Sequence, residues 1–192
     1  MYKGTNASDG IGIGTAVIVE EAELIITRRE VNDTEAEVQR FKGALETTIA
    51  ETQKMAEDLA ARVGEKEAEI MQGHMMLLSD PMLTGEIENS IQNDKVNSEF
   101  AIENVCNMYA DMFASMGDEL MQQRATDMRD IKVRMQRTLM GLQSVDVSAL
   151  PAGTILVAKD LTPSMTAGIN PENVSGIVTE LGGKTSHSAI LA

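Results

Sequence analysis

Residues 176–192 read GIVTELGGKTSHSAILA, and this stretch indicates how the C-terminal part of the chain folds. Residues 176–179 favour a strand, and a turn at Gly182 and Gly183 follows. The residues after the turn have the composition of a helix start. This order is typical of a phosphate site, because the first N–H groups of a helix are unpaired and carry the positive end of its dipole. The stretch therefore predicts α/β structure and an anion site.

The same alternation of strand and helix is found upstream and at the start of the chain. Residues 154–158 (TILVA) predict a strand, and Pro163 after Thr162 predicts the beginning of a short helix. Residues 15–19 (TAVIV) predict a strand that follows glycines, and residues 24–27 predict a connecting strand. We expect one α/β unit that is assembled from both ends of the chain.

The middle of the chain has a helical pattern. Asn32 followed by Glu35 indicates a capping box at the first helix, and Gly64 indicates its end. Further helical patterns cover residues 70–78, 82–93, about 98–116 and 121–142. The third long helix is expected to turn one stripe to the core, made of Ala101, Val105, Met108, Met112 and Met116.

These segments predict an α+β fold overall. An α/β subdomain is expected from residues 1–32 together with residues 144–192, and an antiparallel helical bundle, residues 33–143, is inserted between them. The 14 methionines are explained by the cores of these helices without a cofactor.

Composition excludes several classes of function. The net charge of −14 argues against nucleic acid and anionic membranes, and it suits a basic protein partner. No apolar run approaches the length of a membrane span. The single cysteine, Cys106, fits a reducing cytosol, and its apolar helical neighbours indicate a core residue rather than a catalytic one.

His187 is one of two histidines, and two interpretations of it stay open on the residues alone. It is either a hydrogen-bonded structural histidine at a helix start, or a nucleophile that carries a phosphoryl group. The preceding glycines and the hydroxyl groups of Thr185 and Ser186 favour the second. His74 by the residues alone is a surface or core histidine, and no Cys/His cluster indicates a metal site.

Four segments resemble Enzyme I, the phosphoenolpyruvate-protein phosphotransferase of bacterial sugar uptake. The loop GGKTSHSAI at residues 182–190 resembles its active-site signature. GHMMLL at residues 73–78 and RATDMRDI at residues 124–131 are similar to two helices of its helical subdomain. LVAKDLTPS at residues 156–164 is similar to the strand and helix start before its active site. The resemblance covers essentially the whole chain.

The resemblance implies a phosphohistidine subdomain and a mechanism. His187 would accept a phosphoryl group from phosphoenolpyruvate (PEP), which binds with Mg²⁺ on a separate C-terminal domain, and would pass it to the histidine of the carrier protein HPr. Thr166 would hydrogen-bond His187, while Thr185 and Ser186 would orient its ring. Gly182, Gly183 and Lys184 would form the phosphate loop, although Lys184 replaces the more common arginine and cannot form its bidentate contact.

The resemblance also implies a docking face for HPr on the helical subdomain. Its residues would be Glu65, Ile70, His74, Met76, Leu77, Asp80, Met82, Leu83 and Arg124.

The chain ends at Ala192, where the family's phosphohistidine subdomain continues. We therefore expect a truncated fragment that holds no metal, is monomeric although the full-length enzyme is a homodimer, and works in the cytoplasm. Two alternatives stay open: a swivelling phosphohistidine domain of the pyruvate phosphate dikinase or phosphoenolpyruvate synthase type, and a non-catalytic helical interaction module. The first would carry a nucleotide-binding module before such a loop, where this chain has helices.

Overall fold

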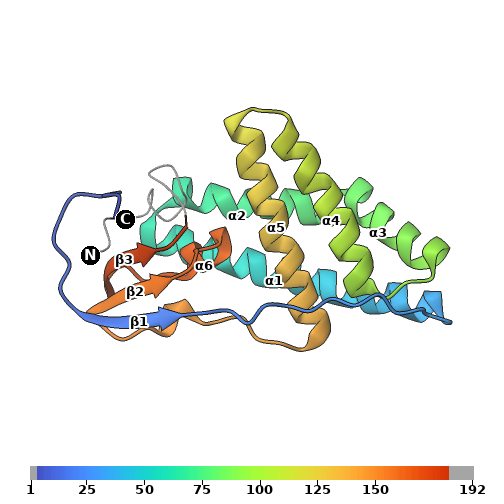
Figure 1. Cartoon of the computed structure of the whole chain (residues 1–192), viewed down its shortest axis with the longest axis horizontal. Helices are drawn as coiled ribbons and strands as arrows, with labels where there is room; N and C mark the ends of the chain where they lie inside the picture. The colour runs from blue at the N-terminus through green and yellow to red at the C-terminus, as the bar shows by residue number, and fades with distance from the viewer. Residues whose placement is uncertain (1–3, 182–192) are drawn as a thin grey trace.

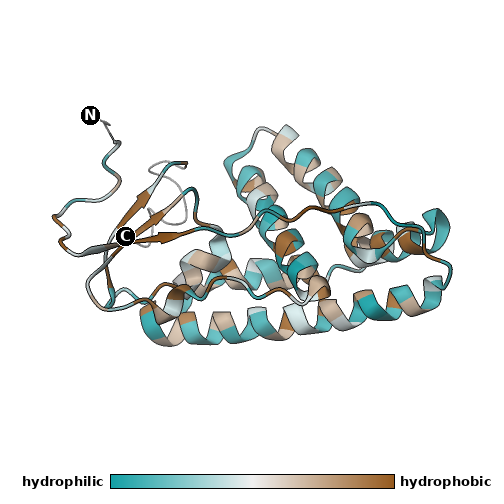
Figure 2. Cartoon of the chain, turned by 60° about the horizontal axis from the view of Figure 1, so that its bottom comes forward, coloured by the Kyte–Doolittle hydropathy of each residue, from teal (hydrophilic) through white to brown (hydrophobic). Residues whose placement is uncertain are grey.

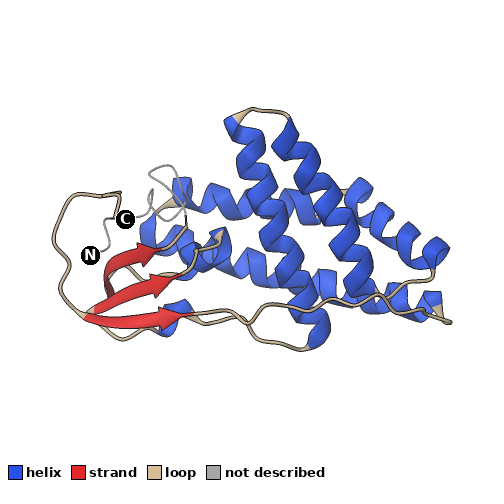
Figure 3. Ribbon diagram, viewed as in Figure 1, coloured by secondary structure: helices blue, strands red, loops and turns tan. Residues whose placement is uncertain are grey.

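The computed structural model describes residues 4–181, which are mostly helical and include a small parallel sheet (Figure 3). The sheet is formed by β1 (Thr15–Val19), β2 (Thr154–Ala158) and β3 (Val174–Thr179), in that order and with both pairs parallel. β1 aligns Thr15 with Thr154, so the two ends of the chain meet in one sheet, as the sequence predicts. The strands are the most uniformly apolar elements (Figure 2).

Five helices separate β1 from β2. They are α1 (Thr34–Val63), α2 (Glu65–Leu78), α3 (Pro81–Asp94), α4 (Ser98–Ser115) and α5 (Glu119–Met140). A short 3₁₀ turn, η1 (Val147–Ala149), precedes β2, and the helix α6 (Pro163–Gly168) connects β2 to β3. In Figure 1 the sheet lies at one end of the molecule, and the strands point toward the helices.

The cores follow this arrangement. Residues of α1, α3, α4 and α5, among them Phe41, Ile87, Ile102 and Met135, form one buried cluster. A second cluster lies around the sheet, η1 and α6 and is made of Val19, Val147, Leu150, Leu156, Ala158, Leu161 and Met165. A small cluster of Leu59, Met71 and Ala167 joins α1 and α2 to α6. The domain boundaries expected from the sequence stay a prediction.

Two local predictions are wrong. The first long helix begins one residue later than expected: its N-cap is Asp33, whose side chain accepts a hydrogen bond from the Ala36 N–H at 3.0 Å, and not Asn32. Residues 24–27 are not a strand. The connection from β1 to α1 instead runs extended along the helices (Figure 1). Isolated hydrogen bonds hold it there, such as the bond from the Asn97 N–H to the Arg29 carbonyl oxygen at 3.1 Å.

The predicted stripe of the third long helix is correct only in its first half. Ala101 and Val105 are buried, whereas Met108, Met112 and Met116 are about half exposed, at 51%, 43% and 55%. The reason is that the hairpin of α4 and α5 projects beyond the other helices, so its tip has no layer above it (Figure 1). Cys106 is fully buried as predicted, and burial raises the pKa of its thiol to about 12.

Candidate functional site

The sequence predicts a phosphate site after β3, and the last strand residues that the structure describes lie at the carboxyl edge of the sheet. Because β1, β2 and β3 are parallel, their carboxyl ends lie at one edge, and ligands of open parallel sheets bind outside that edge. β2 leads there into α6, and β3 leads toward the glycine turn. The loop residues Gly182, Gly183, Lys184, Thr185, Ser186 and His187 themselves lie outside the described residues.

Thr166 is the one predicted site residue of this edge that the structure describes. It is 2% exposed and lies in α6. Its backbone N–H and its Oγ1 hydroxyl both donate to the carbonyl oxygen of Thr162, each at 2.9 Å. Because the hydroxyl proton is used within the helix, the lone pairs of Oγ1 are what Thr166 offers to a further partner. Thr166 is therefore suited to accept an N–H, such as that of a neutral imidazole.

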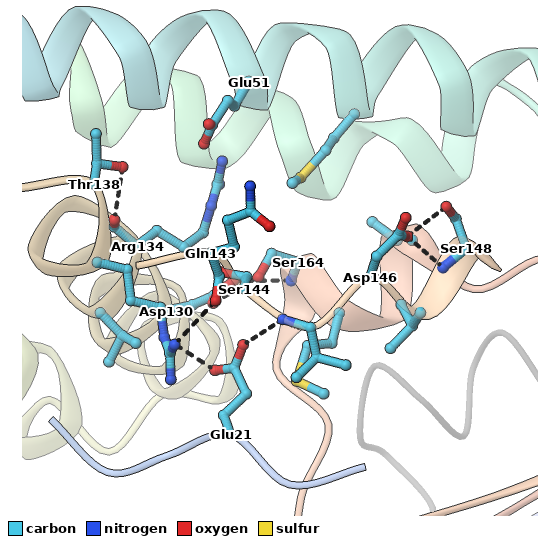
Figure 4. Close-up of a pocket in the computed structure, with 18 of the residues that line it drawn as sticks. Glu21, Glu51, Asp130, Arg134, Thr138, Gln143, Ser144, Asp146, Ser148 and Ser164 are labelled. Atoms are coloured by element: carbon cyan, nitrogen blue, oxygen red, sulfur yellow. Dashed lines mark hydrogen bonds and ion pairs between the residues drawn. The ribbon is translucent and has the colours of Figure 1, made fainter. Parts of the chain in front are cut away.

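Asp130 on α5 joins this helix to the rest of the molecule. Its Oδ2 accepts from the backbone N–H of Ser164 and its Oδ1 accepts from the Ser164 hydroxyl, both at 2.8 Å, and all these groups are buried. Figure 4 shows the pair beside the cavity described below. Sequence reasoning missed this role, although Asp130 lies in a segment that resembles a helix of the Enzyme I family.

His74 lies behind the predicted docking face instead of on it. Its side chain is 0% exposed, with Nε2 at 3.3 Å from Asp127 Oδ1 and Nδ1 at 3.8 Å from Asp130 Oδ2. The prediction that His74 contacts a partner is corrected, because two buried carboxylates enclose the ring. The prediction that Leu83 belongs to the docking face is also corrected, because Leu83 is 2% exposed and belongs to the helical core.

The other predicted docking residues reach the surface. Met76 and Met82 are 69% and 68% exposed, which is unusual for large apolar side chains. Glu65 is exposed, and Ile70, Leu77 and Asp80 are at least partly exposed. Asp80 also caps α3, accepting from the Met82 N–H at 2.8 Å.

Arg124 belongs to α5, and its guanidinium group packs against Gly73 of α2 at the edge of this face. Its Nη1 is 3.6 Å from Asp127 Oδ2, and a Cβ at Gly73 would overlap that nitrogen. Gly73 thus leaves the room that lets the guanidinium pack against the helix.

A cavity of about 470 Å³ lies between α1, α5, residues 142–148 and α6 (Figure 4). Arg134 points from α5 toward Glu51 of α1, and its two terminal nitrogens have no hydrogen-bond partner among residues 4–181. Burial lowers the pKa of Arg134, while Asp130 and Glu51 oppose that shift. Five carboxylates and three guanidinium groups line the cavity, so it lacks the positive excess that a phosphate requires.

Neither a metal centre nor a membrane span is found in the described part of the chain. Residues 4–181 contain no group of three or more histidine, cysteine or acidic side chains placed to hold a metal ion. No helix within the same range is both long and apolar enough to cross a membrane.

Comparison with solved structures gives the same fold. An NMR solution structure of Enzyme I (nEIt) matches 96% of this chain and 75% of its own length, with a TM-score of 0.84 and 37% identity. The N-terminal domain of Enzyme 1 – Nitrogen matches 96% of this chain and 76% of its own, with a TM-score of 0.68 and 26% identity.

Comparison of sequences gives relatives of much greater length. The phosphoenolpyruvate-protein phosphotransferases of Listeria monocytogenes and Bacillus subtilis are 43% and 41% identical over 190 residues, which is 99% of this chain and 33% of each relative. The chain thus spans about a third of the length of the curated relatives it matches.

Two family models match in succession. The model described as "PEP-utilising enzyme, N-terminal" matches residues 3–124, and that described as "PEP-utilising enzyme, mobile domain" matches residues 150–192. Because the first match covers more than half of the chain, the chain belongs to the family of PEP-utilising enzymes.

Proposed function

We propose that this chain is the phosphoryl-carrying part of a phosphoenolpyruvate-protein phosphotransferase, with His187 as the carrier. The observation that carries the proposal is the match of the mobile-domain model to residues 150–192, which include the loop with His187. The relatives of that name, which align over nearly the whole chain, support it. The position of β3, which leads from the sheet toward this loop, agrees with a site at the carboxyl edge.

The proposed reaction has two transfers. A nitrogen lone pair of His187 attacks the phosphorus of PEP, so that a P–N bond forms and the P–O bond to enolpyruvate breaks. A histidine of HPr then attacks the same phosphorus, the P–N bond breaks, and His187 regains its lone pair. Phosphoryl transfer depends mainly on positioning and charge stabilisation, so few side chains are needed.

Thr166 has the positioning role in this proposal. Since its hydroxyl proton is donated to Thr162, its oxygen accepts the N–H of one ring nitrogen of His187 and leaves the other nitrogen free to attack. Thr185, Ser186 and the loop residues 182–184 hold the ring and the phosphate oxygens.

The helices, residues 33–143, provide the docking face for HPr in the proposal. The face centres on Met76 and Met82, with Ile70, Leu77, Asp80, Glu65 and Arg124 around them. Exposed apolar side chains among acidic ones suit a basic, partly apolar partner, and the net charge of −14 would steer such a partner in. The chain is proposed to act as a monomer in the cytoplasm.

PEP and Mg²⁺ are proposed to bind on another part of the longer protein.

The test is phosphoryl exchange from phosphorylated HPr to this chain, read by intact mass. We expect the gain of one acid-labile phosphate, and its loss in His187→Ala. Binding of HPr without transfer, even in the longer protein, would favour a non-catalytic interaction module. If HPr neither binds to the chain nor transfers a phosphoryl group to it, the proposal is rejected. Sedimentation that shows a tight dimer would reject the proposed monomeric state.

A further inference from the structure

α6 is too short to hold its own position. An isolated helix of six residues is not stable in water, so its place depends on what it is attached to. The strongest attachment near its beginning is the pair of 2.8 Å hydrogen bonds from Ser164 to Asp130, which joins residues 34 positions apart. Both bonds go to one carboxylate, so they fix the beginning of the helix against α5. At its other end, Arg62 of α1 donates to the carbonyl oxygens of Ala167, Gly168 and Ile169.

His74 lies on the other side of Asp130. His74 Nδ1 lies 3.8 Å from Asp130 Oδ2, and His74 Nε2 lies 3.3 Å from Asp127 one turn earlier on α5. Asp130 is 4% exposed and His74 is 0% exposed, so water does not compete for these groups. The two bonds from Ser164 thus lie in a buried environment and define the orientation of the carboxylate.

Thr166 lies two residues beyond Ser164 in the same short helix. Its Oγ1 is tied to the Thr162 carbonyl, so the oxygen moves with the backbone of α6 and cannot adjust independently. A displacement of Ser164 is thereby passed directly to Thr166 Oγ1.

We infer that Asp130 is a positioning residue for phosphoryl transfer, because it holds α6 and with it the oxygen of Thr166 that orients His187. This inference rests on the proposed function of His187. It assigns no contact between Asp130 and the phosphoryl group. Asp130 acts through Ser164 and Thr166.

The test compares two identical substitutions. Asp130→Asn removes the negative charge and one of the two strong acceptors while the volume is kept. Asp146→Asn is the matched control, since Asp146 likewise accepts from the backbone N–H and hydroxyl of one serine, Ser148, at 2.9 and 2.6 Å, but lies exposed at η1. The rate of transfer from phosphorylated HPr is measured against HPr concentration, together with the ¹⁵N shifts of the His187 ring.

We expect Asp130→Asn to lower the maximal transfer rate by about tenfold or more, because small misplacements of a reacting group have effects of that order. The HPr concentration at half-maximal rate should stay unchanged, and the ring shifts of His187 should change. Asp146→Asn should leave all three readouts at their wild-type values. Ser164→Ala, which removes only the hydroxyl donor, should give a smaller effect of the same kind.

An unchanged maximal rate and unchanged ring shifts in Asp130→Asn would overturn the inference. If Asp130→Asn does not fold, Ser164→Ala decides alone, and wild-type rate and shifts in that variant would overturn it. These outcomes differ from failure of the proposed function, in which the wild-type chain takes up no phosphate at all.

Discussion

At the scale of single residues, burial and hydrogen bonding differ from what the neighbouring residues suggest. Thr166 is followed by small apolar residues in a six-residue helix, yet it is buried and keeps its oxygen lone pairs available because its hydroxyl proton is already donated. His74 shows the opposite case. It lies two residues before the exposed Met76, but its own side chain is fully buried and has two aspartates beside the ring.

At this scale we predict that Thr166→Val slows phosphoryl exchange with HPr by about tenfold or more, because the acceptor for the His187 N–H is lost. HPr affinity, measured by titration calorimetry, should not change. Thr52→Val is the control, since Thr52 is fully buried and donates to the carbonyl four residues earlier at 2.7 Å, but lies in α1. Equal rates in the two variants would contradict the role of Thr166.

At the scale of elements, the helix beginnings follow local chemistry. Asp33, Asp80 and Asp118 each accept a backbone N–H from the first turn of the helix that they precede. A carboxylate at this position also interacts favourably with the helix dipole. The difference between Asn32 and Asp33 is one residue, and both side chains are good caps, so sequence alone did not separate them.

Asp33→Ala is predicted to lower the free energy of unfolding by about 1 kcal/mol, the usual effect of losing an N-cap. Asn32→Ala should change it by no more than about 0.5 kcal/mol, since a surface substitution that breaks no specific contact has effects of that size. Urea denaturation followed by circular dichroism measures both. A larger effect at Asn32 than at Asp33 would show that the helix begins one residue earlier.

At the scale of the whole molecule, a buried carboxylate pairs with arginines from segments far apart in the sequence. Glu99 at the start of α4 accepts from Arg40 of α1, from Asn97 at 2.8 Å and from Arg29 at 3.4 Å. Burial alone would raise the pKa of Glu99, but the hydrogen bonds from Arg40 and Asn97 lower it to about 2. Glu99 thus stabilises the fold above its ordinary pKa of 4.5, and this contribution is lost as the pH falls from 4.5 toward 2.

Glu99→Gln should therefore lower stability at pH 7 by about 1.5–3 kcal/mol, the usual range for a hydrogen bond to a charged group. It should also weaken the dependence of stability on pH between 4.5 and 2. Thermal unfolding at several pH values measures both effects, with Glu46→Gln as the control, because Glu46 lies exposed on α1. If the two variants lose stability in parallel as the pH falls, Glu99 is not the group responsible.

The surface as a whole is expected to recruit its partner through Met76 and Met82. Met82→Lys should weaken HPr binding at least about tenfold, because it places a charge in an apolar contact and repels a basic partner. Met140→Lys is the control, since Met140 is also exposed, at 41%, but lies at the far end of α5. Calorimetric titration with HPr measures both, and equal affinities would show that the docking face lies elsewhere.

Much of this architecture could be predicted from local patterns. Strands 15–19 and 154–158, the long helices and the buried Cys106 follow from apolar periodicity, caps and glycines, all of which act over a few residues. These local patterns do not show which faces of a helix are covered by another helix or strand in the folded chain. Met108 and Met112 have core spacing yet are exposed, because the α4–α5 hairpin extends past its partners. His74, Asp130 and Ser164 come together across 90 positions because three helices meet there, and only the packed chain brings such distant polar groups into contact.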